Sequence, residues 1–89
     1  MSLSQQEIFS RVVGILAREF SVSPGDVTMQ TDLQADLDFD SLDAVALAGW
    51  VEEDLDLALT DEEIEQMRSL DQIVAVIAAR LDTVVEKVG

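Results

Sequence analysis

The sequence lacks two residue types on which much protein chemistry depends. Its 89 residues include no Cys and no His. These absences exclude disulfides, zinc fingers, thiolate nucleophiles, histidine general bases and Ser-His triads, and they leave only oxygen ligands for a metal. Most catalytic options are thereby removed, so we do not expect an enzyme, and we assign no residue as a metal ligand.

Basic residues are scarce as well. Five Lys and Arg stand against nineteen Asp and Glu, so the formal net charge is −14, and twelve of the acidic residues lie between Asp36 and Glu65. From Glu19 to Met67 the chain has no Lys or Arg. Such a surface repels nucleic acid and anionic membranes and attracts basic protein patches. The expected partners are basic proteins, without nucleic acid and without membrane insertion.

Length and hydrophobicity indicate one folded domain over residues 1–89. The chain is 48% hydrophobic, which favours a packed core despite the charge. No uninterrupted apolar run is long enough to span a membrane, and the polar start at Gln5, Gln6 and Glu7 differs from a signal peptide. We expect a cytoplasmic monomer.

Apolar residues recur at helical spacing in most of the chain, and no useful stretch alternates with period two. The region from Ser21 to Asp40 holds the only Pro and is predicted to be a long loop, pinned to the core by Val27, Leu33 and Leu37. The fold class is therefore all-α, a small four-helix bundle with a long first loop and a short third helix. The predicted helices are Ser4–Phe20, Ser41–Leu55, Asp61–Gln66 and Leu70–Val85.

The second predicted helix is apolar on two sides. One side must pack in the core; it comprises Ala44, Leu47, Ala48, Val51 and Leu55. The other comprises Leu42, Val45, Ala46 and Gly49, and is either an exposed docking surface or the far side of a helix buried all round.

Gly14 and Gly49 interrupt the first and second predicted helices. Each costs about 1 kcal/mol relative to Ala, and we expect close packing between helices to explain both.

Ser41 lies where the loop meets the second helix, in the segment Phe39-Asp40-Ser41-Leu42-Asp43. A serine at a helix start is commonly an N-cap, and this position also holds it at the surface, where a modifying enzyme can reach it. The sequence places no His or Lys nearby to accept its proton, so we do not expect Ser41 to act alone as a nucleophile.

The spacing of Asp36, Asp38 and Asp40 matches the first half of an EF-hand calcium loop. The second half does not match, because Ser41 stands where the loop needs Gly and Leu47 where it needs Glu. A true EF-hand is therefore not predicted. A cation-responsive acidic interaction module using these three residues stays open as an alternative function, as does a plain acidic scaffold.

The run from Asp36 to Val45 resembles the acyl carrier protein family, and Glu52-Glu53-Asp54-Leu55 and Asp61-Glu62-Glu63 extend the likeness over almost the whole chain. The resemblance implies that Ser41 receives phosphopantetheine from coenzyme A through a phosphopantetheinyl transferase. The arm's thiol would then carry acyl groups as thioesters, a thiol that a chain without Cys must import. The predicted function is an acyl carrier in fatty-acid, polyketide or modified-lipid synthesis.

The resemblance also implies docking partners, namely acyl-transferring and ketoacyl synthase-type enzymes with basic patches. It further implies that the bundle opens to shelter lipid-like cargo near Leu47, Val51, Leu55 and Leu70. The alternative is that these four residues only pack in the core. The predicted partner-binding residues are Asp40, Leu42, Asp43, Val45, Glu52, Glu53 and Asp61.

Three residues depart from the pattern of fatty-acid carriers. Many of those carriers have Glu at the position of Ala46, and Gly49 and Trp50 are atypical for this region. A specialised pathway is therefore favoured, because such a carrier must discriminate its own enzymes from those of the general pathway. Trp50 is either an interface anchor or partly buried against the third helix.

Overall fold

The computed structural model describes residues 3–88, with side chains described as far as Leu81. Within residues 3–88 there is no β-strand, only an isolated bridge between Asp32 and Ser69. The predicted all-α fold with a short third helix is confirmed, and the predicted bounds of the second helix are correct. The elements are α1 (Gln5–Phe20), the short 3-10 helix η1 (Pro24–Asp26), α2 (Ser41–Leu55), α3 (Asp61–Glu65) and α4 (Leu70–Val88).

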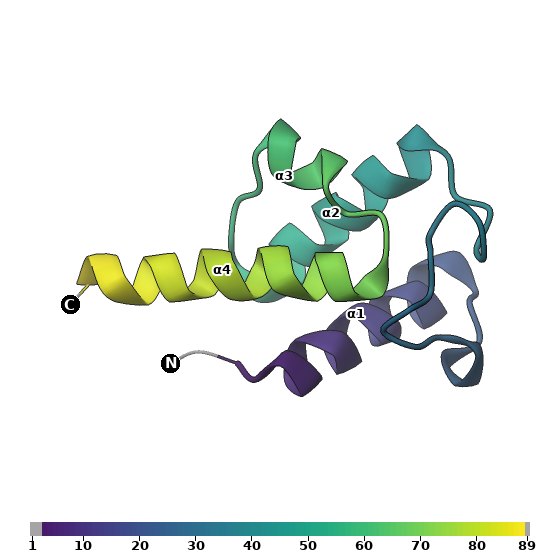
Figure 1. The fold of residues 1–89 in the computed structure, drawn as a ribbon, viewed down its shortest axis with the longest axis horizontal. Coiled ribbons are helices and arrows are strands. Elements are labelled where there is room, and N and C mark those ends of the chain that lie inside the picture. Colours follow the sequence, from purple (N-terminus) through teal and green to yellow (C-terminus); the bar gives the residue numbers. More distant parts are fainter. Residues whose placement is uncertain (1–2, 89) are drawn as a thin grey trace.

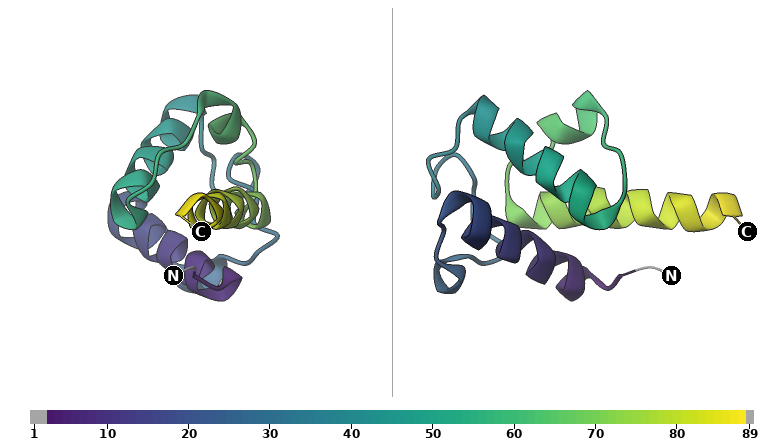
Figure 2. Two further views of the ribbon diagram at one scale, coloured as in Figure 1. Left: turned by 90° about the vertical axis from the view of Figure 1, so that its left-hand side faces the viewer. Right: turned by 180° about the vertical axis from the view of Figure 1, so that it is seen from behind.

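Three long helices form the bundle, and the short α3 lies over α2 and α4 (Figure 1). Helix α1 packs against both α4 and α2, and the view of Figure 2 (left) shows α4 nearly end-on beside them. Burial of each large apolar side chain stabilises the fold by about 1.5–3 kcal/mol. No helix in the described part of the chain is long and apolar enough to cross a membrane. The largest fully buried side chains include Ile8, Ile15, Leu16, Leu47, Leu70, Ile73 and Ile77.

Helices α1, α2 and α3 begin in the same way. At each start, an N-cap side chain accepts a hydrogen bond from the third helical amide, and the acidic side chain at that third position accepts one from the N-cap amide. This reciprocal arrangement satisfies two backbone amides that would otherwise lack partners. The pairs are Ser4 with Glu7, Asp40 with Asp43, and Thr60 with Glu63.

The long loop between α1 and α2 is fixed to the core by its own side chains. Val27 and Leu33 are buried, as predicted, and Leu37 is partly buried against the core. Phe39 is also buried, and its ring centroid lies 5.0 Å from that of Phe20 at the end of α1. This contact holds the last residues of the loop immediately before α2 begins.

Backbone hydrogen bonds tie the same loop to the end of the connection between α3 and α4 and to the first residues of α4. Figure 1 shows the two segments approaching each other near the start of α4. The loop is therefore held by residues far away in the sequence as well as by its own side chains. The bonds run from Leu33 N to Arg68 O (2.8 Å), from Leu70 N to Thr31 O (3.0 Å) and from Asp71 N to Met29 O (2.9 Å).

The two helical glycines are not explained by close packing, and that expectation was wrong. A Cβ added at Gly14 or Gly49 would meet no heavy atom within 4 Å outside its own helical turns. Because Gly in a helix interior costs about 0.5–1 kcal/mol relative to Ala, Gly14→Ala and Gly49→Ala should each raise the free energy of unfolding by about that amount. Thermal melts followed by circular dichroism test this, and a lower melting temperature in either variant would contradict it.

Candidate functional site

Ser41 is the first residue of α2 and is exposed. The cap of this helix is Asp40 rather than Ser41, so the sequence-based assignment of the cap to Ser41 was wrong. The side chain of Asp40 accepts the hydrogen bond from the Asp43 amide that a capping serine would otherwise accept. The Ser41 hydroxyl makes no hydrogen bond with any residue of the described part of the chain.

The two carboxylates beside Ser41 each use one oxygen to build the helix start. Asp43 N donates to Asp40 Oδ1 at 2.9 Å, and Asp40 N donates to Asp43 Oδ2 at 3.2 Å. Negative charge at this end of the helix is also favoured by the helix dipole. The second oxygen of each carboxylate accepts no hydrogen bond from the described residues, so both groups can still interact with a basic partner.

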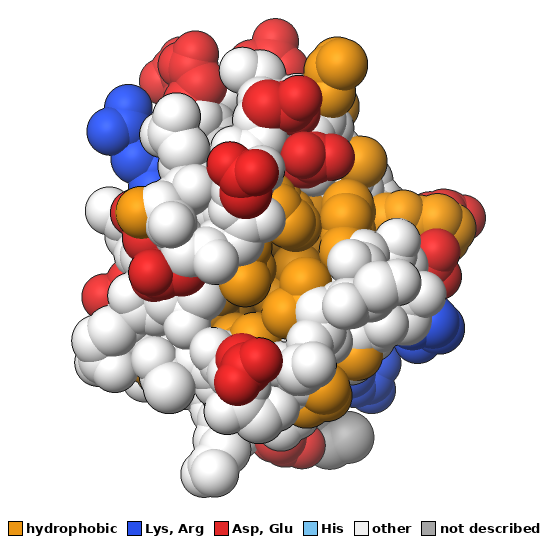
Figure 3. All heavy atoms as spheres, turned by 90° about the vertical axis from the view of Figure 1, so that its right-hand side faces the viewer, with side chains coloured by type: hydrophobic (Ala, Val, Ile, Leu, Met, Phe, Trp, Pro, Cys, Tyr) orange, Lys and Arg blue, Asp and Glu red, His pale blue; other side chains and the backbone are white. Residues whose placement is uncertain are grey.

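A hollow of about 650 Å³ opens beside Ser41, between the long loop, the first turns of α2, and α3 with the connection that follows it. Figure 3 shows this end of the molecule, where hydrophobic side chains form the floor of a depression and Asp and Glu side chains stand around part of its rim. A substituent on Ser41 would therefore start at the edge of a partly apolar hollow. Its apolar lining includes Leu33, Phe39, Val45, Ile64 and Met67.

The outward side of α2 is exposed, so this helix is not buried all round. Leu42 is 78% exposed and Val45 56% exposed, whereas Leu47 and Val51 on the opposite side are fully buried. Trp50 is 39% exposed. Large apolar side chains exposed together beside a charged rim are typical of interaction sites.

The predicted partner-binding residues form two groups. Asp40, Leu42, Asp43 and Val45 lie on the first turns of α2 around Ser41. Glu53 is exposed but lies twelve residues after Ser41, about 18 Å along the helix axis. Only the first group adjoins the serine.

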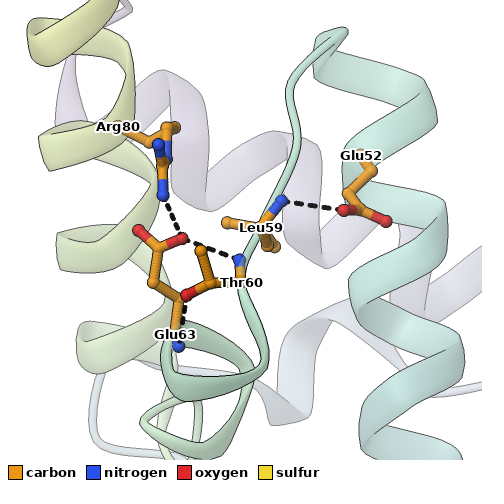
Figure 4. A network of polar contacts seen from close by, with 5 residues as sticks. All are labelled: Glu52, Leu59, Thr60, Glu63 and Arg80. Atoms are coloured by element: carbon orange, nitrogen blue, oxygen red, sulfur yellow. Dashed lines mark hydrogen bonds and ion pairs between the residues drawn. The ribbon is translucent and has the colours of Figure 1, made fainter.

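The second group of predicted partner residues lies where α2 ends and α3 begins. Asp61 is exposed at the start of α3. Glu52 is half-buried, and its Oε2 accepts a hydrogen bond of 2.8 Å from the Leu59 amide (Figure 4). Glu52 thus holds the connection between α2 and α3, and partner binding through it stays a prediction.

Glu63 joins the start of α3 to the middle of α4 (Figure 4). Its Oε1 accepts a hydrogen bond from the Thr60 amide at 2.9 Å and forms an ion pair with Arg80 Nη2. The Thr60 hydrogen bond, with a further contribution from Arg80, lowers the pKa of Glu63 below its ordinary value of 4.5. The ionised form of Glu63 therefore stabilises the position of α3.

This lowered pKa predicts a pH-dependent contribution to stability. The contribution is fully present above pH 4.5 and is lost as the pH falls from 4.5 through the pKa of the folded state. We expect Glu63→Gln to be less stable than the chain without this substitution by about 0.5–1 kcal/mol at pH 7. This difference in the free energy of unfolding should be smaller at pH 3, because the protonated form of Glu63 is more populated there than at pH 7. Urea unfolding followed by Trp50 fluorescence measures both values.

The matched control for this test is the exposed neighbour Glu62, whose side chain makes no hydrogen bond or ion pair with the described residues. Glu62→Gln should leave the free energy of unfolding nearly unchanged at both pH values. A gap between Glu63→Gln and the unmodified sequence that is the same at pH 7 and pH 3 would show that the charge of Glu63 contributes nothing.

The three aspartates of the alternative cation hypothesis do not form a metal site. Asp36 accepts a hydrogen bond from the Asp32 amide at 2.8 Å, Asp38 has a left-handed backbone with φ 59°, and Asp40 caps α2. Among the residues that the structure describes, no group of three or more Asp or Glu could hold a metal ion. The cation-responsive module therefore gains no geometric support.

The sequence analysis missed two residues near Ser41. Phe39 anchors the loop just before the serine, and Arg68 lines the hollow from the connection between α3 and α4. Each carries a weak signal in the sequence. Phe39 is one of three Phe in a chain with few aromatics, and Arg68 is the first basic residue after the long stretch without Lys or Arg.

The fold and this site together define a small helical domain with an accessible serine at the start of its second helix. The family model described as "Phosphopantetheine attachment site" matches residues 10–77. The acyl carrier protein of Coprothermobacter proteolyticus is 33% identical over 91% of this chain and 99% of its own. That of Prochlorococcus marinus is 36% identical over 88% and 98%.

The chain therefore belongs to the acyl carrier protein family, in which the matched domain carries covalently attached phosphopantetheine. Two solved structures share its fold. The acyl carrier protein of Thermotoga maritima has a TM-score of 0.80 at 21% identity, covering 90% of this chain and 93% of its own. That of Enterococcus faecalis has a TM-score of 0.72 at 22% identity, covering 88% and 99%.

Proposed function

We propose that this chain carries acyl groups through phosphopantetheine attached to the hydroxyl of Ser41. The observation that supports the proposal most directly is that this hydroxyl is exposed and makes no hydrogen bond with the described residues, because Asp40 supplies the helix cap. When bound, the group supplies a terminal thiol that holds acyl chains as thioesters. A chain without Cys has no such thiol of its own.

The residues around Ser41 suit attachment but not self-modification. The hollow beside the serine offers room for a substituent, and the chain has no His to accept the serine proton. The proton acceptor must therefore come from the transferase. In this proposal the chain presents Ser41 on a fixed helix start and acts as a carrier rather than an enzyme.

The first turns of α2 are the proposed docking surface for the transferase and for synthase-type enzymes. Leu42 and Val45 supply exposed apolar area, and the free oxygens of Asp40 and Asp43 supply negative charge for basic patches on the partner. Such contacts form fast and weaken with salt, as a carrier that visits several enzymes requires. A monomer in the cytoplasm is part of the same proposal.

The proposed pathway is a specialised one within fatty-acid, polyketide or modified-lipid synthesis. Ala46 is exposed on the outward side of α2 and gives that side no charge, while Trp50 is partly exposed on the same helix. Enzymes that contact this surface would meet apolar groups where a carboxylate is common in other carriers. We expect such differences to select partners.

Intact mass spectrometry tests the proposed attachment. The chain is incubated with coenzyme A, magnesium and a broad-specificity phosphopantetheinyl transferase, and a gain of one phosphopantetheine is expected. Fragmentation should place the added mass on the peptide that contains Ser41. No gain, when a known carrier is modified in the same reaction, would overturn the proposal.

A further inference from the structure

Arg68 differs from the other arginines of this acidic chain because it has no acidic partner. The guanidinium of Arg68 makes no ion pair or hydrogen bond with the residues described, although the chain has nineteen Asp and Glu. The other three arginines all form ion pairs, Arg11 with Asp54 at 3.3 Å, Arg18 with Glu19 at 3.0 Å, and Arg80 with Glu63.

The fold places Arg68 at the same hollow as Ser41. Both residues are part of its lining. Two consecutive backbone hydrogen bonds link the two segments, from Leu33 N to Arg68 O at 2.8 Å and from Phe39 N to Leu33 O at 2.9 Å. Phe39 is two residues before Ser41 and is buried, so the backbone at Arg68 is held in a fixed position relative to the serine.

The hollow beside Arg68 is lined by several acidic residues. Asp32, Asp40 and Glu65 also line the hollow, and Arg68 is the one basic residue among its lining residues. A phosphodiester on Ser41 would add another negative charge to this rim. An unpaired guanidinium can bind phosphate oxygens through two parallel N–H groups, which favours Arg over Lys for such a contact.

We propose that Arg68 binds the phosphate through which the prosthetic group is joined to Ser41, and so holds the first part of the arm against the hollow. This inference rests on the proposed attachment at Ser41. A carboxylate at the far end of an acyl cargo would offer Arg68 the same chemistry. The phosphate is favoured because the residue to which it would be bonded itself lines the hollow.

Nuclear magnetic resonance of the ¹⁵N-labelled chain tests this inference. The Nε–Hε signal of Arg68 should shift when the unmodified chain is converted to the phosphopantetheine form. The shift should shrink at about 1 M salt, where charges are screened over about 3 Å. The signal of Arg18, which pairs with Glu19 and does not line the hollow, should stay unchanged.

A second measurement follows the phosphate itself. The ³¹P signal of the modified chain should shift in Arg68→Gln, shift less in Arg68→Lys, and stay in place in the control Arg18→Gln. Because Arg68 is exposed and unpaired, these variants should fold, and their melting temperatures provide the check. If Arg68→Gln did not fold, the Nε–Hε signal of Arg68 in the chain without this substitution would still show whether Arg68 binds the phosphate.

The outcomes separate this inference from the function on which it rests. If intact mass shows no modification, the proposed attachment fails. If the chain is modified and the Arg68 signal does not move, only the role of Arg68 is overturned. A signal that moves only after a carboxylate-ended cargo is loaded would also overturn the phosphate assignment and transfer the role to the cargo.

Discussion

Ser41→Ala is expected to abolish the mass gain from phosphopantetheine completely while leaving the fold intact. The hydroxyl is the proposed attachment point. Ser41→Ala should therefore gain no phosphopantetheine at transferase concentrations that fully convert the chain without this substitution. The free energy of unfolding should change by less than about 0.5 kcal/mol, because the Ser41 hydroxyl makes no hydrogen bond with the described residues and Asp40 caps the helix.

Asp40→Ala is the matched control for this experiment. It removes the cap and should lower the free energy of unfolding by about 1 kcal/mol, but it leaves the serine in place. Modification should be slower, because Asp40 lies on the proposed docking surface, but it should still reach one group per chain. Intact mass and a thermal melt on each variant give both readouts. A mass gain that persists in Ser41→Ala would move the attachment to another hydroxyl, and a large loss of stability in that variant would contradict the assignment of the cap.

Leu47→Ala should lower the free energy of unfolding far more than Leu42→Ala, although both leucines lie on α2. Leu47 is fully buried, whereas Leu42 is 78% exposed. Truncating a buried leucine costs about 2–5 kcal/mol, including the cavity that it leaves. In a domain of this size that loss lowers the melting temperature by at least about 8 °C. Leu42→Ala should change the free energy of unfolding by less than about 0.5 kcal/mol.

For binding of the transferase, Leu42→Ala should have the larger effect and Leu47→Ala the smaller one. Leu42 lies next to Ser41 on the proposed docking surface, and loss of its side chain should raise the KM of the transferase several-fold, as expected for an anchor residue worth more than about 1 kcal/mol. Leu47→Ala, measured well below its melting temperature, should leave KM near that of the unmodified sequence. If Leu42→Ala had a normal KM, the first turns of α2 would not be the docking surface.

The helices could be predicted from the sequence because their apolar residues follow the period of the α-helix. The two sides of α2 were also separable by this pattern, and Leu47, Ala48 and Val51 are buried as predicted. The pattern could not assign the cap, because Asp and Ser are both favourable N-caps. The reciprocal hydrogen bonds between Asp40 and Asp43 decide the matter in favour of Asp40.

The site around Ser41 was only partly predictable because three separate segments build it. The buried residues Val27 and Leu33 were expected from their hydrophobicity. The contact between Phe39 and Phe20 depends on how the loop crosses the bundle, and so does the place of Arg68 at the same hollow as the serine. The pattern of residues along the sequence does not show which distant segments come together.

The functions of individual carboxylates were also beyond the sequence. The count of acidic residues indicates an acidic surface, but it does not say which carboxylates accept backbone hydrogen bonds. Glu52 holds Leu59, Asp36 holds Asp32, and Glu63 holds Thr60. These three are part of the architecture, whereas the side chains of Glu53 and Asp61 make no hydrogen bond or ion pair with the described residues.

The hydrogen bonds between the long loop and residues 68–71 relate the setting of Ser41 to the order in which the chain is synthesised. Loop residues Met29, Thr31 and Leu33 are bonded to residues 68–71, which leave the ribosome about forty residues later. Until then the loop that precedes Ser41 lacks these bonds. The setting of Ser41 is therefore complete only once the chain has been synthesised as far as residue 71.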